Sequence, residues 1–182
     1  DINLDGEPEI IINSDKIQNF PVLDSGWLNV LTKDGEMVPG WPILLDSNAT
    51  ANVCPTLCNI NDDDSLEIII SSNFEISLGN YHSSINTYSP SGILLKKWNN
   101  TIPENNIIFG EVAVGDINRQ SGIEYAVSDG EGYHFIFDSN GNILPGWPQQ
   151  LVRSVQPKLV DIDNDSIPEI FIGRSSSPND TG

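Results

Sequence analysis

The segment DIDNDSIPEI, residues 161–170, decides the fold expected for this chain. It has acidic residues at its first, third and fifth positions, and a glutamate at its ninth position directly before an apolar run. Three segments align with it without a gap: DINLDGEPEI at 1–10, NINDDDSLEI at 59–68 and DINRQSGIEY at 116–125. The four segments start 58, 57 and 45 residues apart. A recurrence of this length is typical of architectures in which each repeat is one supersecondary unit.

A second landmark, a glycine followed six residues later by a tryptophan, recurs in the same phase. The pairs are Gly35 with Trp41, Gly92 with Trp98 and Gly141 with Trp147. Because their phase is fixed, we expect these tryptophans to pack between neighbouring repeats, where buried aromatics contribute most, and not to form a carbohydrate-binding face. Trp27 is out of phase and is expected to be the more exposed aromatic residue.

Strand-like segments surround each acidic segment. Apolar runs at 9–12, 67–70 and 169–172 predict strands that are buried on both faces. Three dipeptides lie between segments in which apolar and polar residues alternate, and they predict hairpin turns with a positive φ: Asp34-Gly35, Ser91-Gly92 and Asn140-Gly141. Each repeat is therefore expected to consist of a strand, an acidic loop, two strands, a hairpin turn and a strand. Four antiparallel strands of this kind form a β-propeller blade.

This order divides the chain into repeat units of about 1–58, 59–115 and 116–160, with a partial unit at 161–182. The first unit would lack its leading strand, and the last would lack its two outer strands. Propellers have about four to eight blades, so three blades are too few to close a ring. We therefore expect an all-β chain that forms a single propeller segment over residues 1–182, with about three blades and part of a fourth, within a longer chain.

The acidic segments carry the oxygen ligands that Ca²⁺ prefers. Side-chain oxygens at positions 1, 3 and 5 of a tight loop converge on one point, and the glutamate at position 9 can fold back to bind through both oxygens. A glycine at position 6 permits the sharp turn. The candidate ligands of the first to fourth acidic loops (1–9, 59–67, 116–124 and 161–169) are, in order, Asp1, Asn3, Asp5 and Glu9; Asn59, Asn61, Asp63 and Glu67; Asp116, Asn118, Gln120 and Glu124; and Asp161, Asp163, Asp165 and Glu169.

These loops resemble the FG-GAP or VCBS repeat of integrin α-subunit propellers and of many microbial surface proteins. The resemblance implies a β-propeller with Ca²⁺ between the first and second strands of each blade, and an extracellular or cell-surface location. Up to four calcium sites are expected. The strongest are the fourth loop, with four carboxylates, and the first loop, with three carboxylates and Gly6. The second and third loops, with Asp64 and Ser121 in the glycine position, depart from the family pattern and are expected to bind weakly or not at all. The fourth loop also lacks the glycine and has Ser166 there, so this feature alone does not decide the ranking.

The charge of the chain bears on its partners. The net charge is −18, and 14 of the 26 acidic residues lie in the four ten-residue segments. The simpler alternative is that these segments are ordinary Asp and Asn turns without a metal; four aligned copies that each end in glutamate favour the metal. The negative charge argues against nucleic acid and anionic membrane surfaces as partners. No apolar run approaches the ~20 residues of a membrane-spanning helix.

No catalytic motif is found in the sequence. All ligands of each expected site come from one loop, which leaves little room for a substrate and favours a structural ion. We therefore expect a non-catalytic, calcium-stabilised extracellular scaffold for adhesion or for binding a protein or glycan. Two alternatives stay open: the propeller part of a secreted polysaccharide-degrading enzyme or hydrolase, and a structural subunit of a surface layer or filament.

Overall fold

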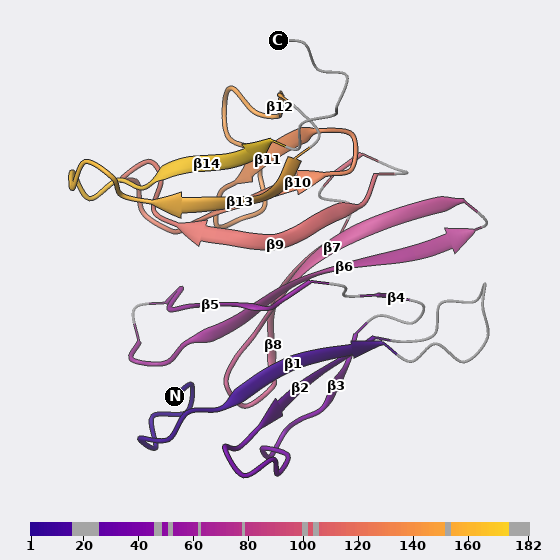
Figure 1. Cartoon of the computed structure of the whole chain (residues 1–182), viewed down its shortest axis with the longest axis vertical. Coiled ribbons are helices and arrows are strands. Elements are labelled where there is room, and N and C mark those ends of the chain that lie inside the picture. The colour runs from indigo at the N-terminus through magenta and orange to yellow at the C-terminus, as the bar shows by residue number, and fades with distance from the viewer. Residues whose placement is uncertain are drawn as a thin grey trace. The chain divides into compact units, whose positions relative to one another are not determined.

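The computed structural model of the protein describes residues 1–15, 26–45, 49–50, 53–61, 63–77, 79–99, 102–103, 106–151 and 154–174. Over these ranges the chain forms strands and no helix, so the all-β prediction is confirmed. The described residues therefore contain no helix that is long and apolar enough to cross a membrane. The chain separates into two compact units, residues 1–107 and 108–182 (Figure 1).

The first unit contains two antiparallel sheets (Figure 1). The order of the first sheet is β1-β2-β3, and that of the second is β4-β6-β7-β8 with β5 also paired to β6. The strands of the two sheets are β1 (Ile10–Asp15), β2 (Gly26–Leu31) and β3 (Ile43–Leu44), then β4 (Ala49–Thr50), β5 (Thr56–Cys58), β6 (Glu67–Ser77), β7 (Asn80–Tyr88) and β8 (Leu94–Asn99). The first acidic loop leads into β1, and the second joins β5 to β6.

The second unit also contains two antiparallel sheets, ordered β12-β11-β10-β9 and β13-β14. Their strands are β9 (Ile108–Gly115), β10 (Glu124–Asp129), β11 (Tyr133–Phe137), β12 (Gln149–Gln150), β13 (Ser154–Val160) and β14 (Glu169–Arg174). The third acidic loop joins β9 to β10, and the fourth joins β13 to β14. None of the four sheets closes on itself. The glycines of the three predicted hairpin turns have positive φ angles, which confirms those turns: Gly35, Gly92 and Gly141.

The apolar runs after the acidic loops differ in burial. In β6 the side chains of Ile68, Ile69 and Ile70 are fully buried, as predicted. The prediction is wrong for the runs in β1 and β14, where Ile10 is 46% exposed and Phe171 is 43% exposed. The physical reason lies in the sheets. β6 has partner strands along both edges, whereas β1 and β14 each pair with a single strand, so fewer neighbouring side chains cover them.

Trp41 joins the two sheets of the first unit. Its ring is 6% exposed and belongs to a core with Leu28, Ile68 and Tyr88. Its indole Nε1–H donates to the carbonyl oxygen of Pro90 at 2.9 Å, and its ring meets that of Tyr88 edge-on with centroids 6.3 Å apart. Trp41 thus packs on the next repeat, as predicted for this position.

The other three tryptophans are less deeply placed. Trp98 and Trp147 share the sequence phase of Trp41 but are half-buried, so full burial is found only at Trp41 among the three. Trp27, on β2, is half-buried too and is not set apart by exposure. Within the described residues, the Pro90 turn is what distinguishes the surroundings of Trp41.

Gly40 permits this close approach of two turns, and its replacement tests it. A Cβ at Gly40 would lie 2.3 Å from the carbonyl oxygen of Ser91, and the residue has φ 95°. Gly146, at the same place in the second Pro-Gly-Trp-Pro motif, has φ 91° and no atom within 4 Å of such a Cβ. Gly146→Ala should cost about 1–2 kcal/mol of unfolding free energy from backbone strain alone. Gly40→Ala should cost about 3 kcal/mol or more, because a steric clash adds to the strain. Urea denaturation of both variants measures the difference, and equal losses would contradict the packing of the two turns.

Candidate metal centre

The first and fourth acidic loops share one backbone conformation. Positions 4 and 6 have positive φ angles in both loops: Leu4 at 63° and Gly6 at 89°, Asn164 at 60° and Ser166 at 71°. The third loop has a positive φ at Arg119 but not at Ser121. The two loops with the most carboxylates therefore also have the same curl, in which successive backbone N–H groups point inward.

The carboxylate at position 1 receives these N–H groups. In the first loop, Asp1 accepts the N–H of Asp5 at 3.1 Å and that of Gly6 at 2.8 Å. In the fourth loop, Asp161 accepts the N–H groups of Asp165 and Ser166 at the same two distances. The position-5 carboxylate in turn accepts the N–H of position 7, at 2.9 Å for Asp5 and 2.7 Å for Asp165. These bonds fix the directions of the carboxylates without using all of their oxygen lone pairs.

The glutamate at position 9 folds back in every loop. Its Oε2 accepts the backbone N–H of position 2, at distances of 2.8, 3.0, 2.8 and 2.9 Å for Glu9, Glu67, Glu124 and Glu169. Glu67 is 1% exposed and Glu124 is 2% exposed. Among the described residues, neither forms an ion pair with lysine or arginine. Each buried carboxylate instead accepts a hydrogen bond from a side-chain amide in addition to that from the backbone N–H, from Asn61 for Glu67 and from Asn118 for Glu124.

The structure brings three carboxylates together in each of two loops. Oxygen atoms of Asp1, Asp5 and Glu9 lie within 4.8 Å of one another, and those of Asp161, Asp163 and Glu169 do so as well. Asp165 lies outside the second group, although its loop position matches that of Asp5. The side-chain oxygen of Asn3 accepts the N–H of Asp5 at 3.0 Å, which keeps this oxygen on the inner side of its loop.

The second loop shares one bond with the first, in which the side-chain amide of position 3 donates to the acid of position 5, and differs in its other polar contacts. The amide nitrogen of Asn61 donates to Asp63 at 2.9 Å and to Glu67 at 3.4 Å, and that of Asn59 donates to the carbonyl oxygen of Asp63. A hydrogen bond from the side chain of Ser65 lowers the pKa of the Asp63 carboxyl. The Asn61 amide thus also contacts Glu67, the position-9 carboxylate that a metal would bind, and weak calcium binding by this loop stays a prediction.

The third loop also uses its amide as a donor. The side-chain nitrogen of Asn118 donates to Glu124 at 3.0 Å, and Asp116 accepts the backbone N–H of Arg119 at 2.7 Å. Gln120 takes part through its backbone N–H, which donates to the Asn118 side-chain oxygen at 2.6 Å. This loop has two carboxylates at its candidate positions, Asp116 and Glu124, whereas the first and fourth loops each bring three together.

Arg119 is a residue near the candidate site that the sequence analysis did not identify. Its guanidinium donates to the backbone carbonyl oxygen of Asp165 and lies 3.9 Å from the Asp165 carboxylate. Both side chains are about half exposed, so the pair contributes little stability. The arginine at position 4 of the third loop was visible in the sequence, but the approach of two loops 46 residues apart was not.

Ser166 supplies a test of the shared curl. A serine at φ 71° is strained by about 1–2 kcal/mol, part of which glycine would relieve at the cost of greater freedom in the unfolded chain. Ser166→Gly should therefore raise the unfolding free energy by about 0.5–1 kcal/mol. Ser121→Gly is the matched control, because Ser121 occupies the same loop position without a positive φ and should gain nothing. Thermal melts of both variants compare them, and a gain at Ser121 equal to that at Ser166 would contradict the assigned loop conformations.

Comparisons with models of protein families, with curated proteins and with solved structures find no match. The donors are carboxylate and amide oxygens, which suit a hard cation such as Ca²⁺. No His or Cys belongs to either convergent group, so a soft or nitrogen-preferring metal is a poorer match.

Proposed function

We propose that the protein is a calcium-stabilised, non-catalytic scaffold of the FG-GAP or VCBS type, which acts outside the cell or at its surface in adhesion or in binding a protein or glycan. The observation that carries this proposal is the convergence of carboxylates in the first and fourth acidic loops, at Asp1, Asp5 and Glu9 and at Asp161, Asp163 and Glu169. Three negative oxygens within 4.8 Å repel one another, and a divalent cation at their centre would turn that repulsion into attraction.

A structural role for the ion is supported by the origin of its ligands. In both loops they come from nine consecutive residues, so a bound ion would tie the ends of one loop together. Ion binding that favours the folded chain adds stability by mass action. Extracellular calcium modules bind with dissociation constants of roughly 10⁻⁴–10⁻³ M, an affinity that would keep such a structural site filled at millimolar calcium.

The propeller arrangement is part of the proposal. It is supported by antiparallel sheets that recur with the acidic loops, and by the seating of Trp41 on the Pro90 turn of the following repeat. In this proposal the repeat units of about 1–58, 59–115, 116–160 and 161–182 are blades, the last one partial. Stacked blades of this kind bury faces that one repeat alone leaves open.

Calorimetric titration of the chelated protein with CaCl₂ tests the proposal. We expect heat from two sites of the highest affinity, followed by weaker binding at the second and third loops. Asp1→Asn with Asp5→Asn should remove one of the two strong sites, whereas Asn118→Ala with Gln120→Ala should leave both. No heat above dilution at millimolar calcium would contradict the proposal.

A further inference from the structure

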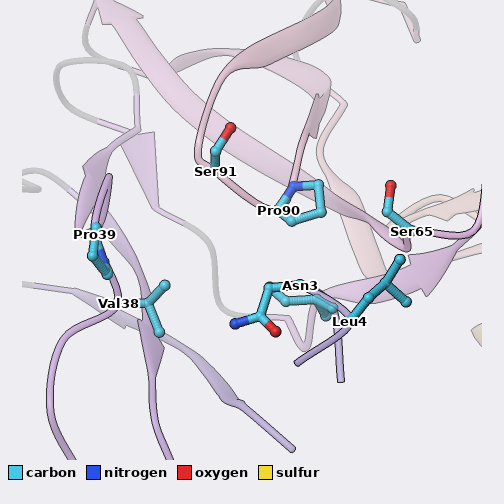
Figure 2. Close-up of a pocket in the computed structure, with 8 residues that line it drawn as sticks. Asn3, Leu4, Val38, Pro39, Ser65, Pro90 and Ser91 are labelled. Atoms are coloured by element: carbon cyan, nitrogen blue, oxygen red, sulfur yellow. The ribbon is translucent and has the colours of Figure 1, made fainter. Parts of the chain in front are cut away.

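A pocket of about 440 Å³ lies in the first unit between the first two acidic loops and two turns (Figure 2). Pockets that bind small groups have volumes of roughly 300–1,000 Å³ and mainly apolar walls with a few polar groups. Five of its eight lining residues are apolar, three are polar and none is charged: Ile2, Leu4, Val38, Pro39 and Pro90, then Asn3, Ser65 and Ser91. Figure 2 shows Val38 and Pro39 on one side of it and Leu4 and Ser65 on the other.

The two turns that line the pocket are fixed in place. The bond from Trp41 to the Pro90 carbonyl oxygen holds the Val38–Pro39 turn against the Pro90–Ser91 turn. Backbone bonds close each turn, from Trp41 N–H to Val38 at 3.1 Å and from Gly92 N–H to Ser89 at 2.9 Å. A preformed wall of this kind lowers the ordering cost that a ligand must overcome.

The conformation of the first acidic loop does not account for a leucine at position 4. It has φ 63°, in the left-handed region that leucine rarely adopts, and its side chain is 57% exposed. The corresponding residues of the third and fourth loops, Arg119 at φ 55° and Asn164 at φ 60°, are polar. The conformation is thus a property of the loop, whereas the exposed apolar side chain is particular to the first loop. Residues that are unfavourable for folding are frequently kept for binding.

The surroundings of the pocket are negative. The amide of Asn3 donates to Asp5 at 3.1 Å, and the hydroxyl of Ser65 donates to Asp63 at 2.5 Å, so a carboxylate lies directly behind each of two polar wall residues. Residues 1–107 contain fifteen acidic side chains and four lysines. One of these, Lys33, is paired with Glu7 at 2.8 Å. This field attracts a ligand with a positive charge next to its apolar part.

We propose that the pocket binds an apolar side chain of a partner polypeptide that is followed by a lysine or arginine. The apolar walls would take the side chain, Leu4 would cover it, and Asp63 behind Ser65 would attract the cation, with Asp5 adding to the attraction only while the first loop holds no calcium. A glycan is a poorer match, because none of the eight lining residues offers an aromatic face. The inference rests on the proposed function only in taking the protein to be a binding scaffold.

The test is a titration of the ¹⁵N-labelled full chain with the blocked dipeptide N-acetyl-Leu-Lys-amide, followed by NMR. We expect shift changes concentrated at the backbone amides of Asn3, Leu4, Val38, Ser65 and Ser91, with a millimolar dissociation constant for so small a probe. N-acetyl-Gly-Lys-amide and N-acetyl-Leu-Glu-amide should bind about tenfold more weakly, the first without the apolar contact and the second with a repelled charge. Equal affinities for the three dipeptides, or shifts elsewhere, would overturn the proposal.

Leu4→Asn separates a binding role from a structural one. Asparagine tolerates the left-handed conformation better, so the melting temperature should not fall, while N-acetyl-Leu-Lys-amide should bind at least fivefold more weakly. Ile76→Asn, which removes an exposed apolar side chain outside the pocket, should leave binding unchanged. Unaltered binding by Leu4→Asn would refute the assignment, and shifts at the same amides with chitotriose but not with the dipeptides would show a glycan site instead. A calcium titration of the same sample reports on the proposed function separately, because the apolar contact with Leu4 does not require calcium; calcium bound at Asp5 should reduce only the preference for lysine over glutamate.

Discussion

Trp41→Ala is expected to lower the free energy of unfolding by about 3–5 kcal/mol, the usual loss when a large buried aromatic side chain is removed. The ring is 6% exposed, and its removal leaves a cavity beside Tyr88 and the Pro90 turn. The Pro90 carbonyl oxygen loses its donor as well. Because Trp41 joins the two sheets of the first unit, the loss should appear as a lower midpoint in urea denaturation.

Two further variants identify the source of that loss. Trp41→Phe keeps most of the buried surface but loses the hydrogen bond to Pro90. The loss of this bond should lower the free energy of unfolding by about 1–2 kcal/mol, in addition to the loss from the smaller ring. Trp147→Ala, in the matching motif of the second unit, removes a half-buried ring and should cost about 1–2 kcal/mol. If Trp41→Ala and Trp147→Ala destabilise the protein equally, the special contribution assigned to the Trp41 contact with the next repeat is wrong.

The second large effect is expected when Asp161 and Asp165 are both replaced by alanine. Calcium at 100 times its dissociation constant adds about 2.7 kcal/mol per site, and the double variant should lose this increment for the fourth loop. Asp161 also accepts two backbone N–H groups, so the variant should be less stable even without calcium. The informative quantity is therefore the gain in unfolding free energy on addition of calcium, measured for each protein by urea denaturation.

The control for this variant lies in the third loop. Asn118→Ala with Gln120→Ala alters positions 3 and 5 of a loop that has two candidate carboxylates, Asp116 and Glu124, where the fourth loop has four. Its calcium-dependent gain should equal that of the unmodified protein. If calcium raises the unfolding free energy of the two double variants equally, the fourth loop does not bind calcium more tightly than the third.

Much of the fold could be predicted because local signals coincide. Acidic loops, β-branched runs and glycine turns each specify strands and their boundaries, and a repeat presents the same signals several times. Burial was harder to predict. The isoleucines of β1 and β6 look alike in the sequence, yet Ile10 is half exposed and Ile68 is buried. Their difference arises from the number of neighbouring strands, which a local pattern does not encode.

The sequence predicted candidate metal ligands in each acidic loop, and one of them, Asp165, lies outside the group of carboxylates that converges in the fourth loop. The carboxylate count singled out the first and fourth loops, and the structure brings three carboxylates together in each of them. The count could not show that Asn61 and Asn118 turn their amide nitrogens toward the acids, because either end of an amide can face inward. It also gave no sign of the pocket beside Leu4, which forms from four segments distant in sequence.

The central claim, that the acidic loops are structural calcium sites, is tested most directly by a thermal melt of the unmodified protein in the presence of a chelator and then of increasing CaCl₂. We expect the melting temperature to rise as calcium reaches the millimolar range, and MgCl₂ at the same concentrations to have a smaller effect because Mg²⁺ binds such flexible oxygen sites less well. A melting temperature that is the same with chelator and with calcium would contradict the account and leave the acidic loops as ordinary turns.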